Sequence, residues 1–327
     1  MNELARRERV LYPPIQKLLE LRGYAIICEF KTFSPLTRRK RILDLLGFRW
    51  MEDGDLDAWA IEAKPGASPA DTLAALGQAI EYQLYVPRVS VAAEVPREDL
   101  AFAENPLRQL GLGYIHAMPT SATEIIPPAF SPRCYQNEFN HVTRHAGILC
   151  LIGRNRWQED CRREHHSGGD KGTDAAGYPF YCIHTTDPVQ YSMRADGASK
   201  KVYFEIWTDR KPVWTRIYRN VEASRLAVLL ADSDATVTLS IFKRDTFGSL
   251  GNRLEQQQLQ HDQAAISKGL DYARERLKEK RIIPVVSIAT RLWDWDAMPR
   301  RDEATAAVEQ AIKRLNPIKG YLASMAK

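Results

Sequence analysis

Short runs of apolar residues, separated by polar turns, divide the first 120 residues into helices and strands. Helical spacing of apolar positions predicts a helix in IQKLLELRG, entered through Tyr12-Pro13-Pro14 because proline is tolerated in a first helical turn. The same spacing predicts a second helix in PADTLAALGQAIEYQLYV. Runs rich in β-branched and aromatic residues predict five strands: YAIICEF, RILDLLGFRW, LDAWAIEAK, VSVAAEV and GLGYIHA.

A tight turn joins the second and third of these strands. Residues 51–55 contain Asp53-Gly54, and this dipeptide supplies the positive φ that tight turns need, so LDAWAIEAK should return antiparallel beside RILDLLGFRW. With a short helix expected before the last strand, the order is helix, three strands, helix, strand, helix, strand. This order predicts an α/β core, a mixed sheet flanked by helices.

The pattern of the second half differs, and it predicts an α+β domain. Strands are predicted for KVYFEIWT, VWTRIYRN, ATVTLSIFKR and IIPVVSIAT. A long helix is predicted for Glu255 to Arg281 and a final helix for Glu303 to Leu315. Residues 153–177 are polar and contain glycine, which predicts a long exposed loop.

Prolines mark the boundary between the two halves. Residues 121–135 contain Pro127, Pro128 and Pro132, and proline clusters interrupt regular structure. We therefore expect a first domain at residues 1–125, a linker at 126–136 and a second domain at 137–327. A chain of 327 residues is long enough for two domains, each with its own core.

Composition restricts the class of protein. No window approaches ~18 consecutive apolar residues, so no membrane partner is expected, and a polar, basic beginning without a signal peptide favours the cytoplasm. The 5 cysteines are never spaced C-x-x-C, which favours free thiols. The net charge of +5 permits a polyanionic partner. The second half would bind such a polyanion, because it has 31 Lys and Arg against 25 Asp and Glu from residue 121 onward.

Three charged residues of the predicted hairpin have the types and spacing of a hydrolytic site. Glu62 and Lys64 are two apart on a strand and therefore project from the same face. Asp44, in the partner strand, can converge with Glu62 on one divalent cation if the register aligns them, and carboxylate oxygens suit Mg²⁺ or Mn²⁺. Such a cation can polarise a phosphodiester oxygen, while protonated Lys64 stabilises developing charge. Asp55 or Asp57 would replace Asp44 in a different register.

Asp44, the Glu-Ala-Lys sequence of residues 62–64 and Gln78 on the following helix together resemble the PD-(D/E)XK nuclease superfamily, which includes many restriction enzymes and junction resolvases. The resemblance covers residues 4 to about 118. It implies a restriction-endonuclease-like core with the element order predicted above. One departure is Leu43, which stands where the named motif has proline.

The resemblance also implies further site residues. Glu8 would be an additional acidic metal ligand, with Glu29 as the competing choice. Gln78 would lie near the catalytic residues, and Tyr82, four residues further along the same helix face, would contact nucleic acid. A nucleic-acid-facing loop, or alternatively a solvated charge run, is expected for the basic residues Arg38, Arg39, Lys40 and Arg41.

The sequence thus predicts a Mg²⁺-dependent endonuclease, able to use Mn²⁺, with DNA favoured over RNA as its substrate. Its likeness to restriction enzymes favours a role in defence against foreign DNA, and a homodimer is compatible with cutting both strands. The alternative is a nucleic-acid-binding or assembly protein whose nuclease-like domain has lost its chemistry. Zinc is not expected, because no zinc template matches the spacing of Cys161, His165, His166, Cys182 and His184.

Overall fold

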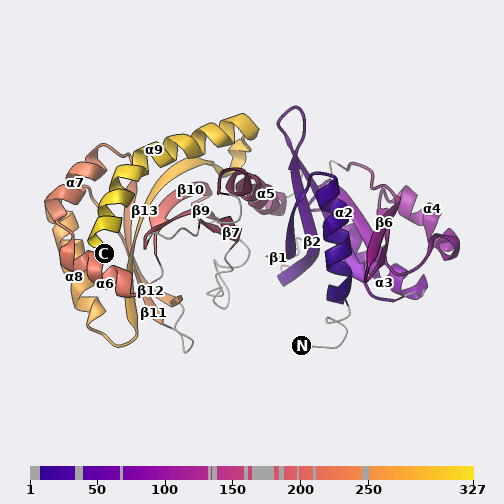
Figure 1. Ribbon diagram of the computed structural model, residues 1–327, viewed down its shortest axis with the longest axis horizontal. Coiled ribbons are helices and arrows are strands. Elements are labelled where there is room, and N and C mark those ends of the chain that lie inside the picture. The colour runs from indigo at the N-terminus through magenta and orange to yellow at the C-terminus, as the bar shows by residue number, and fades with distance from the viewer. Residues whose placement is uncertain are drawn as a thin grey trace. The chain divides into compact units, whose positions relative to one another are not determined.

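The computed structural model divides into two compact units, residues 1–151 and residues 152–327 (Figure 1). Each unit contains a β-sheet with helices packed on it. The structure describes residues 8–33, 40–66, 69–131, 134, 138–157, 161–163, 180–183, 188–196, 199–208, 211–244 and 250–327.

The first unit begins with helical residues and continues into a six-stranded sheet. Its elements are η1 (Arg9–Leu11), α2 (Tyr12–Leu21), β1 (Ala25–Phe33), β2 (Lys40–Trp50), β3 (Leu56–Lys64), α3 (Pro69–Tyr82), β4 (Arg88–Ala93), η2 (Arg97–Asp99), α4 (Ala101–Gln109), β5 (Gly113–Met118) and β6 (Ser121–Ile126).

The sheet of the first unit is mixed, with its strands in sequence order from β1 to β6. Strands β1, β2 and β3 are antiparallel, β4 and β5 run parallel to β3, and β6 is antiparallel to β5. The turn between β2 and β3 forms as expected, with Gly54 at φ 82° and the Met51 amide donating to the Asp55 carbonyl at 2.8 Å. The predicted mixed α/β sheet is therefore confirmed.

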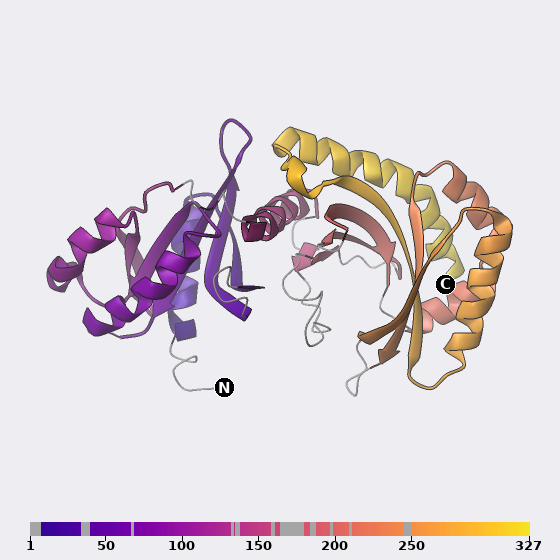
Figure 2. The ribbon, with the colours of Figure 1, turned by 180° about the vertical axis from the view of Figure 1, so that it is seen from behind.

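Helices pack on both faces of this sheet (Figures 1 and 2). The α2 helix buries Ile15 and Leu19 in a core that also contains Trp59 and Ile61 of β3. The α3 helix contacts β3 and β4. Side chains alternate along a strand, so Glu62 projects from the face opposite to Ile61, where it meets α3.

After β5 the chain forms one more strand, which ends at the first residue of the linker expected at 126–136. Residues 121–126 are strand β6, which pairs with β5 and completes the sheet, so the beginning of the proline-rich stretch belongs to the fold. Pro127 and Pro128 follow this strand outside regular structure, and Pro132 lies outside the described residues.

An unpredicted helix, α5 (Glu138–Trp157), contains the division between the two units, which falls after Leu151. This division lies later than the linker expected at residues 126–136. Within the first unit, the helix backbone at Gly147 packs against Phe48 of β2 and Leu56 of β3, with no room for a Cβ atom. The first part of α5 therefore covers the β2–β3 hairpin.

The second unit is an antiparallel sheet with helices. After α5 it contains β7 (Cys161–Arg163), β8 (Phe180–Ile183), β9 (Gln190–Asp196), β10 (Lys201–Trp207), α6 (Lys211–Asn220), α7 (Ala223–Ala231), β11 (Thr236–Arg244), β12 (Leu250–Leu259), α8 (Gln263–Leu277), β13 (Ile282–Asp294), η5 (Trp295–Ala297) and α9 (Arg301–Met325).

Five long strands form most of this sheet in the order β12-β11-β13-β10-β9, and the short strands β8 and β7 continue it. Helices α6, α8 and α9 contact β13, while α7 packs on α8 and α9 (Figure 2). Three of the strands predicted from sequence are found here, as β10, β11 and β13. No helix in the described parts of either unit is long and apolar enough to cross a membrane.

Two predictions for the second half are wrong. The run VWTRIYRN was expected to be a strand, but it lies in helix α6, whose buried Val213, Trp214, Ile217 and Tyr218 follow helical spacing. The single helix expected from Glu255 to Arg281 is instead strand β12 followed by α8. Of the loop expected at 153–177, the described residues belong to α5 and β7, and the others lie outside the described residues.

Candidate active site

The β2–β3 hairpin brings Asp44 beside Glu62. The register pairs Leu45 with Ile61, so Asp44 and Glu62 are the next residues of the two strands, and the negative charge of Glu62 acts on Asp44. The Asp44 carboxylate accepts a hydrogen bond from the Ala63 amide at 2.8 Å, which ties it to the backbone of β3. The register anticipated from sequence therefore places the two carboxylates together.

Lys64 lies between two carboxylates at the end of β3. Its Nζ is 2.8 Å from Oε1 of Glu62 and 3.0 Å from Oε1 of Glu8. Burial acts to lower the pKa of this ammonium, but the charges and hydrogen bonds of Glu62 and Glu8 outweigh it, so the pKa of Lys64 is raised. Lys64 is therefore held as a cation.

Asp44 is a carboxyl group that resists ionisation. Burial, and then the negative charge of Glu62, raise the pKa of Asp44 to about 8, although the Ala63 amide and the Lys64 ammonium act in the opposite direction. The Asp44 carboxyl group therefore retains its proton at neutral pH. Such an arrangement costs stability and is typical of functional sites.

Two phenols hold the two carboxylates. Tyr82 of α3 donates to Oε2 of Glu62, with 2.5 Å between the oxygen atoms, and its hydroxyl is also 2.9 Å from the Ile42 carbonyl oxygen. Burial raises the pKa of the Tyr12 phenol, as do the charge of Asp44 and its hydrogen bond with Tyr12. The sequence indicated Tyr12 only as part of a helix start, because no spacing rule shows which neighbour a helical residue meets.

The two candidates for an additional acidic ligand lie in different surroundings. Glu8, just before η1, reaches Lys64. Glu29 of β1 forms an ion pair with Arg9 at 2.5 Å. It has φ 51°, and its neighbours in β1 pair with the residues on either side of Asp44. A non-glycine residue in the left-handed region is uncommon and often marks a functional site.

The other acidic residues considered as replacements for Asp44 lie elsewhere. Asp55 is in the turn before β3, where its amide donates to the Asp53 carboxylate at 3.0 Å. Asp57 is fully buried and forms ion pairs with Arg49 at 3.0 Å and Arg88 at 3.1 Å. Of these residues, only Asp44 therefore adjoins Glu62.

The remaining sequence-predicted residues are spread over α3 and the start of β2. Gln78 is half-buried one turn before Tyr82, and none of the hydrogen bonds between described residues joins it to a carboxylate. Tyr82 is 1% exposed, so its ring is inside the site rather than on a surface that nucleic acid could reach. Arg41 forms an ion pair with Glu81 at 3.1 Å. Arg38, Arg39 and the Lys40 side chain lie outside the described residues.

The carboxylates of the hairpin fit a divalent cation for which water and substrate supply most of the ligands. Among the described residues, no three His, Cys, Asp or Glu side chains are grouped as a metal site, so Glu8 does not join Asp44 and Glu62 in a cluster. Mg²⁺ commonly binds through only one or two carboxylates together with water and substrate phosphates. Oε1 of Glu62 is buried and its partner is the Lys64 ammonium, so a divalent cation bound to this oxygen would share it with Lys64.

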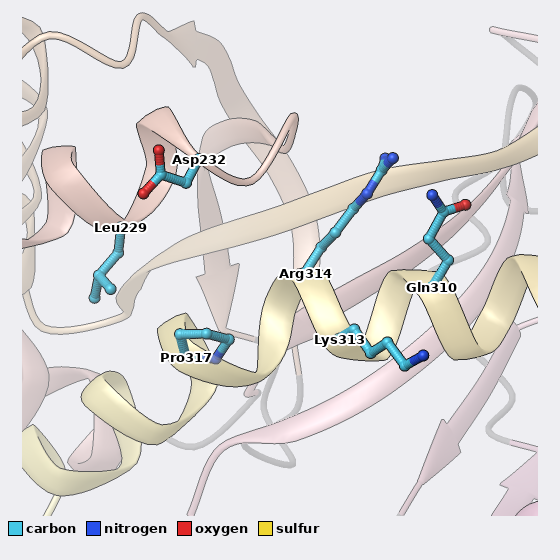
Figure 3. Close-up of a pocket in the computed structure, with 6 residues that line it drawn as sticks. All are labelled: Leu229, Asp232, Gln310, Lys313, Arg314 and Pro317. Carbon is cyan, nitrogen blue, oxygen red and sulfur yellow. The ribbon is translucent and has the colours of Figure 1, made fainter.

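A surface pocket of the second unit has a different character. It is lined by Leu229 of α7, by Asp232 directly after that helix and by residues of α9 (Figure 3). The α9 residues are Gln310, Lys313, Arg314 and Pro317. Its charged residues are of both signs, and Arg314 is 3.7 Å from Asp234. The hairpin, with buried Glu62 beside Asp44, is therefore the stronger candidate for chemistry. Of the possible zinc ligands, Cys161 and Cys182 lie in β7 and β8, and the three histidines lie outside the described residues.

Comparison of the chain with models of known protein families, with characterised proteins and with solved structures finds no match. The functional assignment must therefore come from the site itself.

Proposed function

We propose that the chain is a Mg²⁺-dependent nuclease of the PD-(D/E)XK type that hydrolyses phosphodiester bonds, with DNA favoured over RNA as its substrate. The observation that carries the proposal is the buried carboxylate of Glu62 beside the half-buried carboxyl group of Asp44, with the Lys64 ammonium 2.8 Å from Glu62. Burying two acids beside each other costs free energy, and a divalent cation would compensate both charges at once.

Each residue of this site has a role in the proposed reaction. Asp44 and Glu62 supply the oxygen ligands, and a divalent cation held by them provides Lewis-acid polarisation of the phosphodiester and activation of water. Lys64, kept protonated by Glu62 and Glu8, stabilises the negative charge that develops on the phosphate oxygens. The Ala63 amide fixes the direction of the Asp44 carboxylate.

The test is cleavage of a panel of nucleic acids by the purified chain. Linear duplex, single-stranded and branched DNA and RNA are incubated with Mg²⁺, Mn²⁺ or EDTA. We expect metal-dependent cleavage that falls at least about 100-fold in Lys64→Ala and in Glu62→Gln, because each removes a charge from the reacting centre. Lys17→Ala, which removes an exposed lysine of α2, is the matched control and should cleave like the wild type.

Two outcomes would argue against this proposal. Cleavage that survives in both site variants would place the activity elsewhere or in a contaminant. Binding without cleavage across the whole panel, with metals present, would favour the alternative of a nucleic-acid-binding protein on a nuclease-like fold.

A further inference from the structure

The Tyr82 hydroxyl joins three elements of the first unit at one point. The residue is the last of α3, its phenol donates to Oε2 of Glu62 on β3, and it lies 2.9 Å from the Ile42 carbonyl oxygen on β2. Tyr82 and Glu62 are each 1% exposed, so water does not compete for the hydrogen bond between them. Ile42 is two residues before Asp44, and the phenol therefore connects the strand of one carboxylate to the side chain of the other.

The short contact with Glu62 is of the strong kind. A phenol that donates to a carboxylate makes a charge-assisted hydrogen bond, for which oxygen separations of about 2.5–2.7 Å are normal. A phenol carries a single proton, so it cannot donate fully to both Glu62 and Ile42. The 2.5 Å contact identifies Glu62 as the principal acceptor. The Ile42 contact then limits where the phenol oxygen can lie.

This bond determines which oxygen of Glu62 is available. Because Oε2 is engaged by Tyr82, the carboxylate cannot rotate freely, and Oε1 is directed to Lys64. Oε1 is therefore the oxygen of Glu62 that Tyr82 leaves for cations, and in this structure the Lys64 ammonium lies 2.8 Å from it. Resting on the function proposed above, we infer that Tyr82 is a positioning residue: it orients Glu62 so that Oε1 binds the divalent cation together with Asp44.

This role differs from the contact with nucleic acid that the sequence suggested for Tyr82. A residue that orients a metal ligand affects metal affinity first, typically by 10–100-fold. Tyr82→Phe keeps the ring and removes only the hydroxyl. We therefore expect it to weaken Mn²⁺ binding by about tenfold or more, and to raise the Mn²⁺ concentration needed for half-maximal cleavage more than it lowers the rate at saturating Mn²⁺.

The decisive measurement is calorimetric titration of the whole chain with Mn²⁺, which needs no cleavage. Tyr24→Phe is the matched control, because the Tyr24 phenol donates to the buried Asp57 carboxylate at 2.7 Å, away from Glu62. It removes the same kind of hydrogen bond and should bind Mn²⁺ like the wild type. Tyr82→Met, whose flexible side chain fills similar space without a donor, gives a second test if Tyr82→Phe does not fold.

The outcomes separate this inference from the proposed nuclease activity. Weaker Mn²⁺ binding in Tyr82→Phe but not in Tyr24→Phe supports the positioning role, even if no nucleic acid is cleaved, in which case only the nuclease proposal fails. Equal affinities of wild type and Tyr82→Phe would overturn the positioning role while leaving the nuclease proposal intact. A wild-type chain that binds no Mn²⁺ would overturn both.

Discussion

At the scale of the residue, the site is a balance between burial and charge. Burial and the charge of Glu62 raise the pKa of Asp44, and Lys64 offsets part of the negative charge by staying protonated. This balance makes the protonation of the pair sensitive to pH in the range where proteins normally work. A metal ion bound here as proposed would displace the proton of Asp44, which would link metal binding to pH.

The raised pKa of Asp44 predicts how the stability of the metal-free protein depends on pH. The folded state retains a proton up to about pH 8, whereas an aspartate in the unfolded chain releases it near its usual, much lower value. This contribution to stability is therefore complete in acid and is lost as pH rises to about 8. The free energy of unfolding in EDTA should fall over this range by up to about 1.4 kcal/mol per pH unit.

Urea unfolding at pH 5 and at pH 8, with EDTA present, measures this effect. Asp44→Asn removes the titrating group and should show a smaller decrease between the two pH values than the wild type. Equal decreases in the two proteins would mean that Asp44 ionises normally in the folded chain.

The neighbours of Asp44 show how much of the site could be predicted from sequence. Glu62 and Lys64 share a strand face because strands alternate strictly, and the Asp-Gly turn set the register that brings Asp44 to Glu62. The partners of Tyr12 and Tyr82 could not be predicted in this way. They depend on how a helix packs against a sheet, which local spacing does not encode.

At the scale of the element, the wrong secondary-structure predictions fall on segments whose residues favour one kind of element while their packing requires another. Trp214, Ile217 and Tyr218 are residue types that favour strands, but their spacing buries them all on one side of α6. In β12, glutamate and glutamine favour a helix, yet the segment pairs with β11 at the edge of the sheet. In both cases the tertiary environment overrode intrinsic preference.

Two helical glycines of the first unit predict opposite results from the same substitution. A Cβ atom on Gly147 of α5 would lie 2.4 Å from Cδ1 of Phe48 and 2.9 Å from Cδ2 of Leu56, whereas one on Gly77 of α3 would meet nothing within 4 Å. Gly147→Ala should therefore destabilise the chain by about 1–3 kcal/mol through overpacking. Gly77→Ala should stabilise it by about 1 kcal/mol through helix propensity.

Urea unfolding of the two alanine variants beside the wild type tests this pair of predictions. A Gly147→Ala variant as stable as Gly77→Ala would show that α5 does not lie against the β2–β3 hairpin.

At the scale of the whole molecule, the sequence indicated two parts but did not locate the division inside α5. Prolines are strong local signals, and they drew the expected linker to residues 126–136. Prolines indicate where regular structure is interrupted. A domain boundary depends instead on which hydrophobic core each segment packs into. Residues up to Leu151 join the first unit.

This difference predicts how fragments of the first unit behave. A fragment of residues 1–157 retains α5, while a fragment of residues 1–131 ends after the expected linker has begun and leaves Phe48 and Leu56 without the helix. Each large apolar side chain that becomes exposed costs roughly 1.5–3 kcal/mol, so the shorter fragment should be less stable by at least about 3 kcal/mol. Thermal unfolding of both fragments measures the difference. If they melt at the same temperature, α5 contributes nothing to the first core, and the boundary belongs at the prolines.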